Sequence, residues 1–269
     1  MHMKIGNREF KEHGKTYIMG ILNVTPDSFS DGGKWNDRDR ALFHVEEMIK
    51  EGMDILDIGG ESTRPGYEKL AAEEEIARIV PVVEAIKSRF KVPVSLDTYK
   101  AEVAEAGLAA GVDMINDIWG LKYDKKMADI IAKSGVPCCL MHNRSHSDYR
   151  DFLREVEQDL AETLKIAQDA GIACDKIILD PGVGFGKNYQ QNLEIIRNLE
   201  RFHMFGCPLL LGTSRKSVIG LTLDLPVEER LEGTLATTVI GVMKGCSFVR
   251  VHDVKENVRA VRMTEAVIG

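Results

Sequence analysis

Short apolar segments rich in β-branched residues recur along the whole chain and alternate with longer amphipathic segments. The short segments are nearly continuous in apolar character, which is typical of parallel strands buried on both faces of a sheet. The alternation of a half-exposed antiparallel strand is not their pattern. Eight strands are therefore predicted, at 18–24, 55–60, 92–98, 114–118, 137–142, 177–182, 207–213 and 248–253.

The segments between these strands have the periodicity of amphipathic helices. The clearest covers 148–170, where apolar residues recur at intervals of three or four, and 73–90 and 227–244 behave similarly. Glycines suited to a helix C-cap follow several of these segments. They are Gly52, Gly111, Gly135, Gly171 and Gly245.

Eight strands alternating with eight helical segments predict a single (β/α)8 TIM barrel, with residues 1–269 as one domain. A doubly wound open sheet is the alternative. Residues 3–10, with a turn at Gly14, are expected to form a short N-terminal β-hairpin that closes the bottom of the barrel. No linker or low-complexity segment divides the chain.

The amino-acid composition indicates which kinds of binding partner to expect. A net charge of −7 and a pI near 5.6 argue against nucleic acid and anionic membrane surfaces, so small molecules are the expected partners. No run of 18 apolar residues is present to span a membrane. The five cysteines lack a CxxC spacing, and four of them lie in apolar runs, which indicates buried thiols in a reducing cytoplasm.

Polar residues end almost every predicted strand. In a barrel, catalysis takes place at the C-terminal ends of the strands, so these residues are the candidates for function. A single Asp at such a position is often only a helix N-cap, and Asp117 and Asp253 could be no more than that. The full set is Asn23, Asp57, Asp97, Asn116, Asp117, His142, Asp180, Thr213 to Ser217, Arg250, His252 and Asp253.

Asp97, Asn116 and Asp180 resist the capping explanation. Asp97 and Asn116 lie within or at the end of apolar runs, where a carboxylate without a partner is costly, so a donor-rich ligand is expected. Converging carboxylate and amide groups complement a flat heterocycle with adjacent N–H and NH₂ donors. Lys216 adds a cation for a ring carbonyl or nitrogen.

An anion site is expected beside this group. Arg250, His252 and Asn23 end neighbouring strands and would suit a phosphate or pyrophosphate, and the Asn23 side-chain oxygen would suit a hard metal ion. The alternative for Arg250 is a salt bridge at the rim of the barrel.

Two motif matches fail. The glycines of 182–186 resemble a phosphate loop, but Lys187 is followed by Asn188 rather than Ser or Thr, and the spacing fits neither the Walker loop nor the dinucleotide fingerprint. No Gly-x-Ser-x-Gly elbow is present, and Ser214 has no evident base, so nucleophilic serine catalysis is weakly supported.

Seven strings in this order closely resemble the dihydropteroate synthase family. They are GILNVTPDSFSDGG (20–33), DIGGESTRPG (57–66), SLDT (95–98), IND (115–117), DPGVGFGK (180–187), SRKS (214–217) and RVHD (250–253). The resemblance implies a TIM barrel that joins p-aminobenzoate to dihydropterin pyrophosphate, releasing pyrophosphate and forming dihydropteroate with the help of Mg²⁺. It also implies a cytoplasmic homodimer that associates through its later helices, and a p-aminobenzoate site for which sulfonamides compete.

The resemblance carries roles onto matching residues. The pterin would be held by Asp97, Asn116, Asp180 and Lys216, and the pyrophosphate by Asn23, Arg250 and His252, with Asn23 also contacting the metal ion. The p-aminobenzoate site would be formed by Thr63, Arg64, Pro65, Phe185 and Ser217. A loop bearing Phe29 and Asp31 would close over the reacting centre, where Asp31 could stabilise positive charge on the pterin.

Two other functions stay open. A methyltetrahydrofolate-dependent methyltransferase would share a pterin pocket but would not need the 214–216 string or both long loops. A non-catalytic pterin-binding protein would not need to keep the residues Asn23, Asp31, Arg64, Lys216 and His252. The 143–147 segment departs from the family's pattern and is expected to touch none of the substrate residues.

Overall fold

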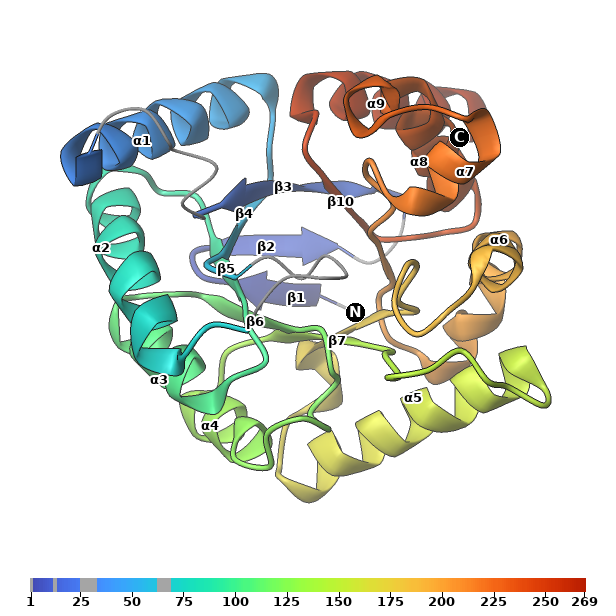
Figure 1. Ribbon diagram of the computed structural model, residues 1–269, viewed down its shortest axis with the longest axis horizontal. Coiled ribbons are helices and arrows are strands. Elements are labelled where there is room, and N and C mark those ends of the chain that lie inside the picture. Colours follow the sequence, from blue (N-terminus) through green and yellow to red (C-terminus); the bar gives the residue numbers. More distant parts are fainter. Residues whose placement is uncertain (1, 12–13, 25–32, 62–68) are drawn as a thin grey trace.

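Eight parallel strands form the central ring of the structure, a computed structural model that describes residues 2–11, 14–24, 33–61 and 69–269 (Figure 1). A bridge between Leu179 and Leu209 joins the two end strands and closes the ring. The strands are β3 (Tyr17–Asn23), β4 (Ile55–Gly59), β5 (Val94–Asp97), β6 (Met114–Asp117), β7 (Cys138–Met141), β8 (Ile177–Asp180), β9 (Leu210–Leu211) and β10 (Phe248–Val251). The predicted barrel is confirmed.

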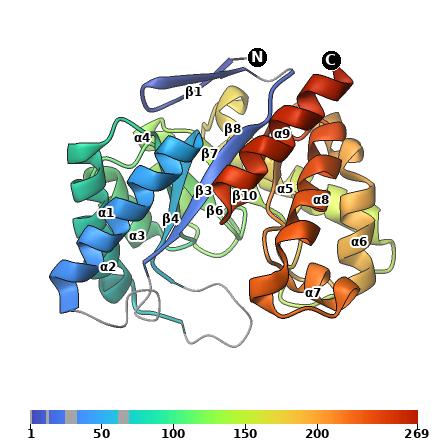
Figure 2. The same cartoon turned by 90° about the horizontal axis from the view of Figure 1, so that it is seen from above.

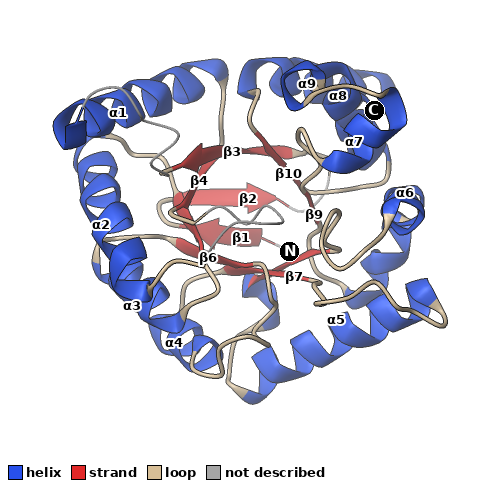
Figure 3. Cartoon of the chain, in the orientation of Figure 1, coloured by secondary structure: helices blue, strands red, loops and turns tan. Residues whose placement is uncertain are grey.

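Helices surround this ring (Figure 3). They are α1 (Gly33–Glu51), α2 (Ala72–Arg89), α3 (Ala101–Ala109), α4 (Met127–Ser134), α5 (Phe152–Asp169), α6 (Tyr189–Arg197), α7 (Ser217–Leu223), α8 (Leu231–Met243) and α9 (Val254–Ile268), with 3₁₀ turns η2 (Cys174–Lys176), η3 (Leu199–Phe205) and η4 (Val227–Glu229). Their apolar faces and the outward side chains of the strands form the main core, in which the strand residues Leu56, Leu96 and Leu140 are fully buried. Among the described residues, no helix is long and apolar enough to cross a bilayer.

The helix predicted at 227–244 is wrong in one respect, because it divides into η4 and α8. Arg230 stands between them with φ −98° and ψ 16° and so leaves the helical region. Its guanidinium donates to the carbonyls of Leu225 (3.1 Å) and Arg215 (3.0 Å), which fixes the break against the segments on either side of α7. The five predicted capping glycines all have positive φ, as that role requires.

The N-terminal hairpin closes the bottom of the barrel, the end at which the strands begin, which is at the top of Figure 2. Strands β1 (His2–Ile5) and β2 (Arg8–Lys11) pair antiparallel, and the turn is made at Gly6, with φ +58°, and not at Gly14. Met3, Ile5 and Phe10 pack with the inward side chains at the lower ends of the strands. The C-terminal ends of the strands are consequently the end that a ligand can reach.

Candidate active site

Strand register places several of the predicted residues at one level of the barrel. Asn23 pairs with Gly59, Gly59 with Asp97, and Asp97 with Asn116. Gly59 carries no side chain at this level, and Asn23 Oδ1 and Asp97 Oδ2 both lie 3.8 Å from the position that a Cβ would occupy there. The backbone therefore brings an amide oxygen and a carboxylate from different strands to the same spot.

Arg250 joins Asp97, at this level, to Asp57, which lies two residues before Gly59 on β4. Its Nε donates to Asp57 Oδ2 (2.6 Å), and its Nη2 donates to Asp97 Oδ2 (2.5 Å). Asn116 Nδ2 also donates to Asp57 Oδ2, at 3.1 Å. Residues from β4, β5, β6 and β10 thus form one polar cluster, and the Asp57 side chain is 0% exposed within it.

Three acceptors in and beside this cluster stay unused. Within the described part of the chain, Asp57 Oδ1, Asp97 Oδ1 and Ser95 Oγ are buried and have no hydrogen-bond partner. Buried polar atoms of folded proteins almost always have partners. Such oxygens side by side therefore indicate a ligand that brings N–H donors.

Burial governs the charge of the cluster. It raises the pKa of Asp97 to about 7, because the desolvation of the carboxylate outweighs the nearby Arg250 charge, and Asp57 adds to the rise. Burial acts to lower the pKa of Arg250, but the carboxylates of Asp57 and Asp97 outweigh it and the pKa is raised. Arg250 stays charged, whereas Asp97 titrates near neutral pH.

Asp180 and Lys216 form a second group at the barrel mouth, next to Arg250. Asp180 Oδ2 and Lys216 Nζ each lie 3.7 Å from the Cβ position of Gly212, and Asp180 Oδ1 accepts from the amide of Gly182 (2.7 Å). Burial raises the pKa of Asp180 against the Lys216 charge, and burial lowers the pKa of Lys216 to about 8. This pair can offer a ligand both an acceptor and a donor.

The loop after β8 borders Lys216. Lys216 Nζ donates to the carbonyl oxygen of Val183 (2.5 Å) and lies 4.8 Å from the centre of the Phe185 ring. Phe185 is thus beside the second group, as a residue that lines a bound aromatic substrate should be. Ser217, the first residue of α7, is exposed and directly follows Lys216.

His252 has a partner that sequence reasoning missed. Its Nδ1 lies 2.9 Å from Ser214 Oγ, and its backbone amide donates to the same oxygen (3.1 Å). The expectation that Ser214 has no base nearby is therefore wrong. Because Ser214 Oγ bonds both the ring and the backbone of His252, the hydroxyl serves to orient the imidazole.

Asp117 and Asp253 have different roles. Asp117 accepts from the amides of Trp119 (2.8 Å) and Leu121 (2.7 Å), so its carboxylate shapes the turn after β6. Asp253 precedes α9 but makes no side-chain cap and pairs instead with Arg215. Neither side chain caps the helix that follows, so the capping explanation is wrong for both residues.

The remaining predicted residues lie outside the described part of the chain. They are Phe29, Asp31, Thr63, Arg64 and Pro65. Their roles stay predictions. Those that the structure does describe, Asn23, Asp97, Asn116, Asp180, Phe185, Lys216, Ser217, Arg250 and His252, all come from the C-terminal ends of strands or from the loops that follow them.

The 143–147 segment packs against Gly186, which is not one of the predicted substrate residues. A Cβ on Gly186 would lie 2.5 Å from the Arg144 carbonyl oxygen, so the two backbones pack directly together. Tyr149 Oη also donates to the Gly186 carbonyl, at 2.8 Å. The segment after β7 thus supports the loop that carries Phe185.

The described residues fit a hard cation only in part. They contain no group of three His, Cys, Asp or Glu side chains that could hold a metal ion by themselves. Asn23 Oδ1 beside the Asp97 carboxylate offers the oxygen donors that Mg²⁺ prefers, and Mg²⁺ commonly completes its shell with water and substrate phosphates. The donor set suits a metal ion that arrives with a phosphorylated substrate.

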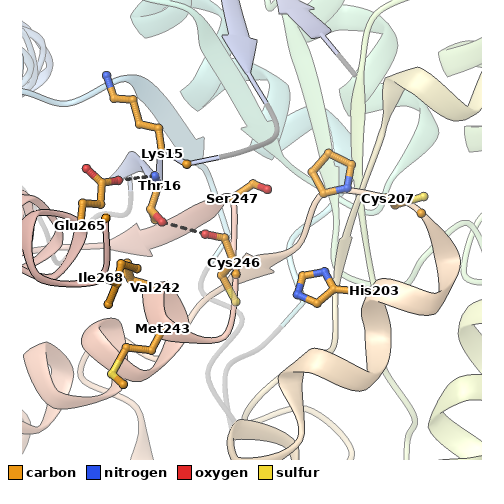
Figure 4. A pocket seen from close by; sticks show the side chains of 15 residues that line it. Lys15, Thr16, His203, Cys207, Val242, Met243, Cys246, Ser247, Glu265 and Ile268 are labelled. Atoms are coloured by element: carbon orange, nitrogen blue, oxygen red, sulfur yellow. Dashed lines mark hydrogen bonds between the residues drawn. The ribbon is translucent and has the colours of Figure 1, made fainter.

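A separate cavity of about 600 Å³ lies at the opposite end of the barrel (Figure 4). It is bounded by residues that precede β3 and β10 and by η3, α8 and α9. Its one carboxylate, Glu265, accepts from the Thr16 amide at 2.6 Å, and Thr16 Oγ1 donates to the Cys246 carbonyl at 2.8 Å. These polar groups satisfy each other, so the C-terminal rim is the better candidate for chemistry.

Comparison with known proteins agrees with this geometry. A family model described as pterin binding enzyme matches residues 19–252. A dihydropteroate synthase of Clostridium beijerinckii is 62% identical over 267 residues, which cover 99% of both chains. The solved dihydropteroate synthase of Clostridium difficile, in the presence of pteroic acid, has a TM-score of 0.93 and 48% identity over 98% of both chains. That of Yersinia pestis, in a sulfonamide drug complex, has a TM-score of 0.92 and 42% identity over 100% of this chain and 99% of its own.

The matched segment contains the strands that supply the two polar groups at the barrel mouth. The chain belongs to the pterin-binding enzymes, in the dihydropteroate synthase family.

Proposed function

We propose that this protein condenses 7,8-dihydropterin-6-ylmethyl pyrophosphate with p-aminobenzoate to give 7,8-dihydropteroate and pyrophosphate. The observation that carries the proposal is the set of buried, unpartnered carboxylate oxygens at the barrel mouth, on Asp57 and Asp97. A pterin has an amino group and ring N–H groups along one edge, which are the donors these oxygens lack. Family membership points to the same substrate.

The pterin would lie between the two polar groups. Asp97 and Asn116 on one side, and Asp180 on the other, would accept from its donors, while Lys216 would donate to its ring carbonyl or nitrogen. Hydrogen bonds of this kind fix the plane of the ring. They would therefore hold the exocyclic methylene carbon, where the reaction occurs, in one place.

The reaction would proceed by pyrophosphate loss ahead of amine attack. The bond from the methylene carbon to the pyrophosphate oxygen breaks, and both electrons leave with the pyrophosphate. The positive charge left on the pterin is stabilised by ring nitrogen donation and by nearby carboxylates. The amine nitrogen of p-aminobenzoate then bonds to that carbon and releases a proton. The amine is a weak neutral nucleophile, so the protein's task is positioning it.

Arg250 would hold the pyrophosphate with a guanidinium that is already partly engaged. In the described part of the chain, Nε and Nη2 donate to Asp57 and Asp97, and Nη1 is left for an anion. His252, oriented by Ser214, and Asn23 would supply the other contacts. We propose that Mg²⁺ is bound at Asn23 with the substrate pyrophosphate, where it would supply positive charge to the leaving group.

The proposal is tested by supplying each substrate in turn. The purified protein is incubated with dihydropterin pyrophosphate, p-aminobenzoate and Mg²⁺, and product is identified by mass. Dihydropteroate is expected only when both substrates are present. A methyl transfer from methyltetrahydrofolate, or pterin binding without product, would instead support one of the two alternative functions.

We also propose a cytoplasmic homodimer. All five cysteines are free thiols, which suits a reducing compartment. Exposed large apolar side chains on α7, α8 and α9 support association through these neighbouring helices. They are Leu221, Leu223, Ile240, Met243, Met263, Val267 and Ile268.

Met243→Glu combined with Val267→Glu is expected to yield a monomer, because it places charges among these apolar side chains, which are 64% and 71% exposed. Molar mass by light scattering during size-exclusion chromatography measures this. Phe43→Glu is the matched control, since Phe43 is 64% exposed but lies on α1. A wild-type monomer, or equal dissociation of the control, would contradict the proposed interface.

A further inference from the structure

Lys187 ends the glycine-rich loop after β8, and its ammonium group has three partners within the protein. Its Nζ donates to the carbonyls of Gly182 (2.8 Å) and Phe185 (2.9 Å) and lies 2.8 Å from His142 Nδ1. Burial lowers the pKa of Lys187 to about 7. In its ammonium form the group has three N–H donors and no acceptor, so three partners satisfy it. Lys187 therefore holds the loop rather than a ligand anion.

The third partner sets the state of His142. Because Nδ1 accepts from Lys187, the ring proton belongs on Nε2, which lies 2.9 Å from Asp159 Oδ2. Burial lowers the pKa of His142 to about 4, so the ring is neutral at neutral pH. Asp159 also accepts from Arg144 Nε at 2.6 Å. The hydrogen bonds from Lys187 to Asp159 thus run in one direction along a buried chain.

The loop that Lys187 holds is the one that meets Lys216. Between the two carbonyls bound by Lys187, Val183 offers its own carbonyl to Lys216 Nζ, and the Phe185 ring lies beside the same ammonium. The loop also fits closely against β7, since a Cβ on Gly182 would lie 1.9 Å from the His142 carbonyl oxygen. A displacement of the loop would therefore move the Phe185 ring and the acceptor of Lys216 together.

We infer that Lys187 is a positioning residue for the reaction, which acts by fixing the 182–186 loop and, through it, Phe185 and Lys216. This inference rests on the proposed function. Phe185, a candidate for the p-aminobenzoate site, lies on this loop. The predicted pterin residues are divided, because Asp180 and Lys216 contact the loop, whereas Asp97 and Asn116 stand on β5 and β6. Loss of Lys187 should therefore affect p-aminobenzoate more than the pterin.

Lys187→Met keeps most of the length of the side chain, one heavy atom shorter, and removes the donors. We expect the KM for p-aminobenzoate to rise roughly tenfold, the size expected when charge-assisted hydrogen bonds to a positioning loop are lost, with a lower kcat. The dissociation constant of dihydropterin pyrophosphate, measured by calorimetry, should change by less than about threefold. Circular dichroism and thermal unfolding show whether the variant is folded.

Chemical rescue tests whether the reaction needs the ammonium group of Lys187 or only the volume of its side chain. In Lys187→Ala, added propylammonium should restore part of the lost activity, whereas propanol of similar size should not. Tyr149→Phe, a milder change that removes one further bond to the loop, should raise the p-aminobenzoate KM in the same direction and by less. Lys176→Ala is the matched control, because Lys176 also donates to a glycine carbonyl, that of Gly135, but at the other end of the barrel.

Several results would overturn the inference. They are wild-type constants in Lys187→Met, equal weakening of both substrates, and equal rescue by propanol and propylammonium. A wild-type protein that makes no dihydropteroate at all is a different result, since it would reject the proposed function and this inference with it.

Discussion

Replacing Asp97 by Asn is expected to weaken the binding of dihydropterin pyrophosphate by about 100-fold, which corresponds to roughly 3 kcal/mol. Asp97 is a buried carboxylate whose Oδ1 has no partner among the described residues. Asn keeps the shape but presents an NH₂ group or a weaker acceptor to the pterin's own donors. A donor facing a donor in a buried site leaves both unsatisfied.

Calorimetry with the pterin substrate measures this effect, and turnover should fall with binding. Asp129→Asn is the control, since Asp129 is exposed on α4 and far from the strand ends. Asp97→Asn also removes a negative charge from Arg250, so the folded state is checked separately by thermal unfolding. Normal pterin affinity in a folded Asp97→Asn protein would refute the assignment of this carboxylate.

Replacing Arg250 by Ala is expected to destabilise the fold by about 3–5 kcal/mol at pH 8, the range for breaking a buried ion pair. The change leaves Asp57 and Asp97 buried without the cation that both contact. Pyrophosphate affinity should also fall. Urea unfolding of the ligand-free protein measures the change in the free energy of unfolding separately from the change in pyrophosphate affinity.

The size of this effect should depend on pH. The pKa of Asp97 is already raised to about 7 with Arg250 present, and removing the cation raises it further. The folded variant then holds a proton that the unfolded chain, with an Asp pKa near 3.9, has released. The contribution of Asp97 to its stability is therefore greatest below about pH 4 and falls as the pH rises toward the raised pKa, above 7. The loss relative to wild type should be smaller at pH 5.5 than at pH 8.

Arg201→Ala provides the comparison for an exposed pair. Arg201 contacts Glu157 and is 46% exposed, so its loss should cost no more than about 1 kcal/mol and vary little over this pH range. A similarly small, pH-independent loss for Arg250→Ala would show that the cluster is not the buried charge network described above.

The barrel could be predicted because its strands are buried on both faces and so appear as continuous apolar runs. The same logic found Asp97 and Asn116, since polar residues within such runs need a reason. It applied equally to Asp57, which follows Ile55 and Leu56, but the partner of Asp57 is Arg250, 193 residues away. A local sequence pattern cannot reveal an ion pair between residues so far apart in the chain.

The role of Lys187 was hidden for a different reason. The comparison with phosphate loops tests only the glycine spacing and the residue after the lysine, and neither fits here because Asn188 follows Lys187. The lysine's partners are two carbonyls of its own loop and His142, which directly follows β7. The pattern of side chains along a sequence does not reveal which backbone carbonyls will be acceptors. Similarly, the break in the helix at Arg230 depends on carbonyls that only the fold brings near.

A crystal structure with bound dihydropterin pyrophosphate is the most direct test of the central claim. The account predicts that the pterin ring contacts Asp97, Asn116, Asp180 and Lys216 at the C-terminal ends of the strands, with the unpartnered oxygens of Asp57 and Asp97 facing or near its donors. A pterin bound instead in the 600 Å³ cavity beneath the barrel, with the strand-end carboxylates still empty of ligand, would contradict it.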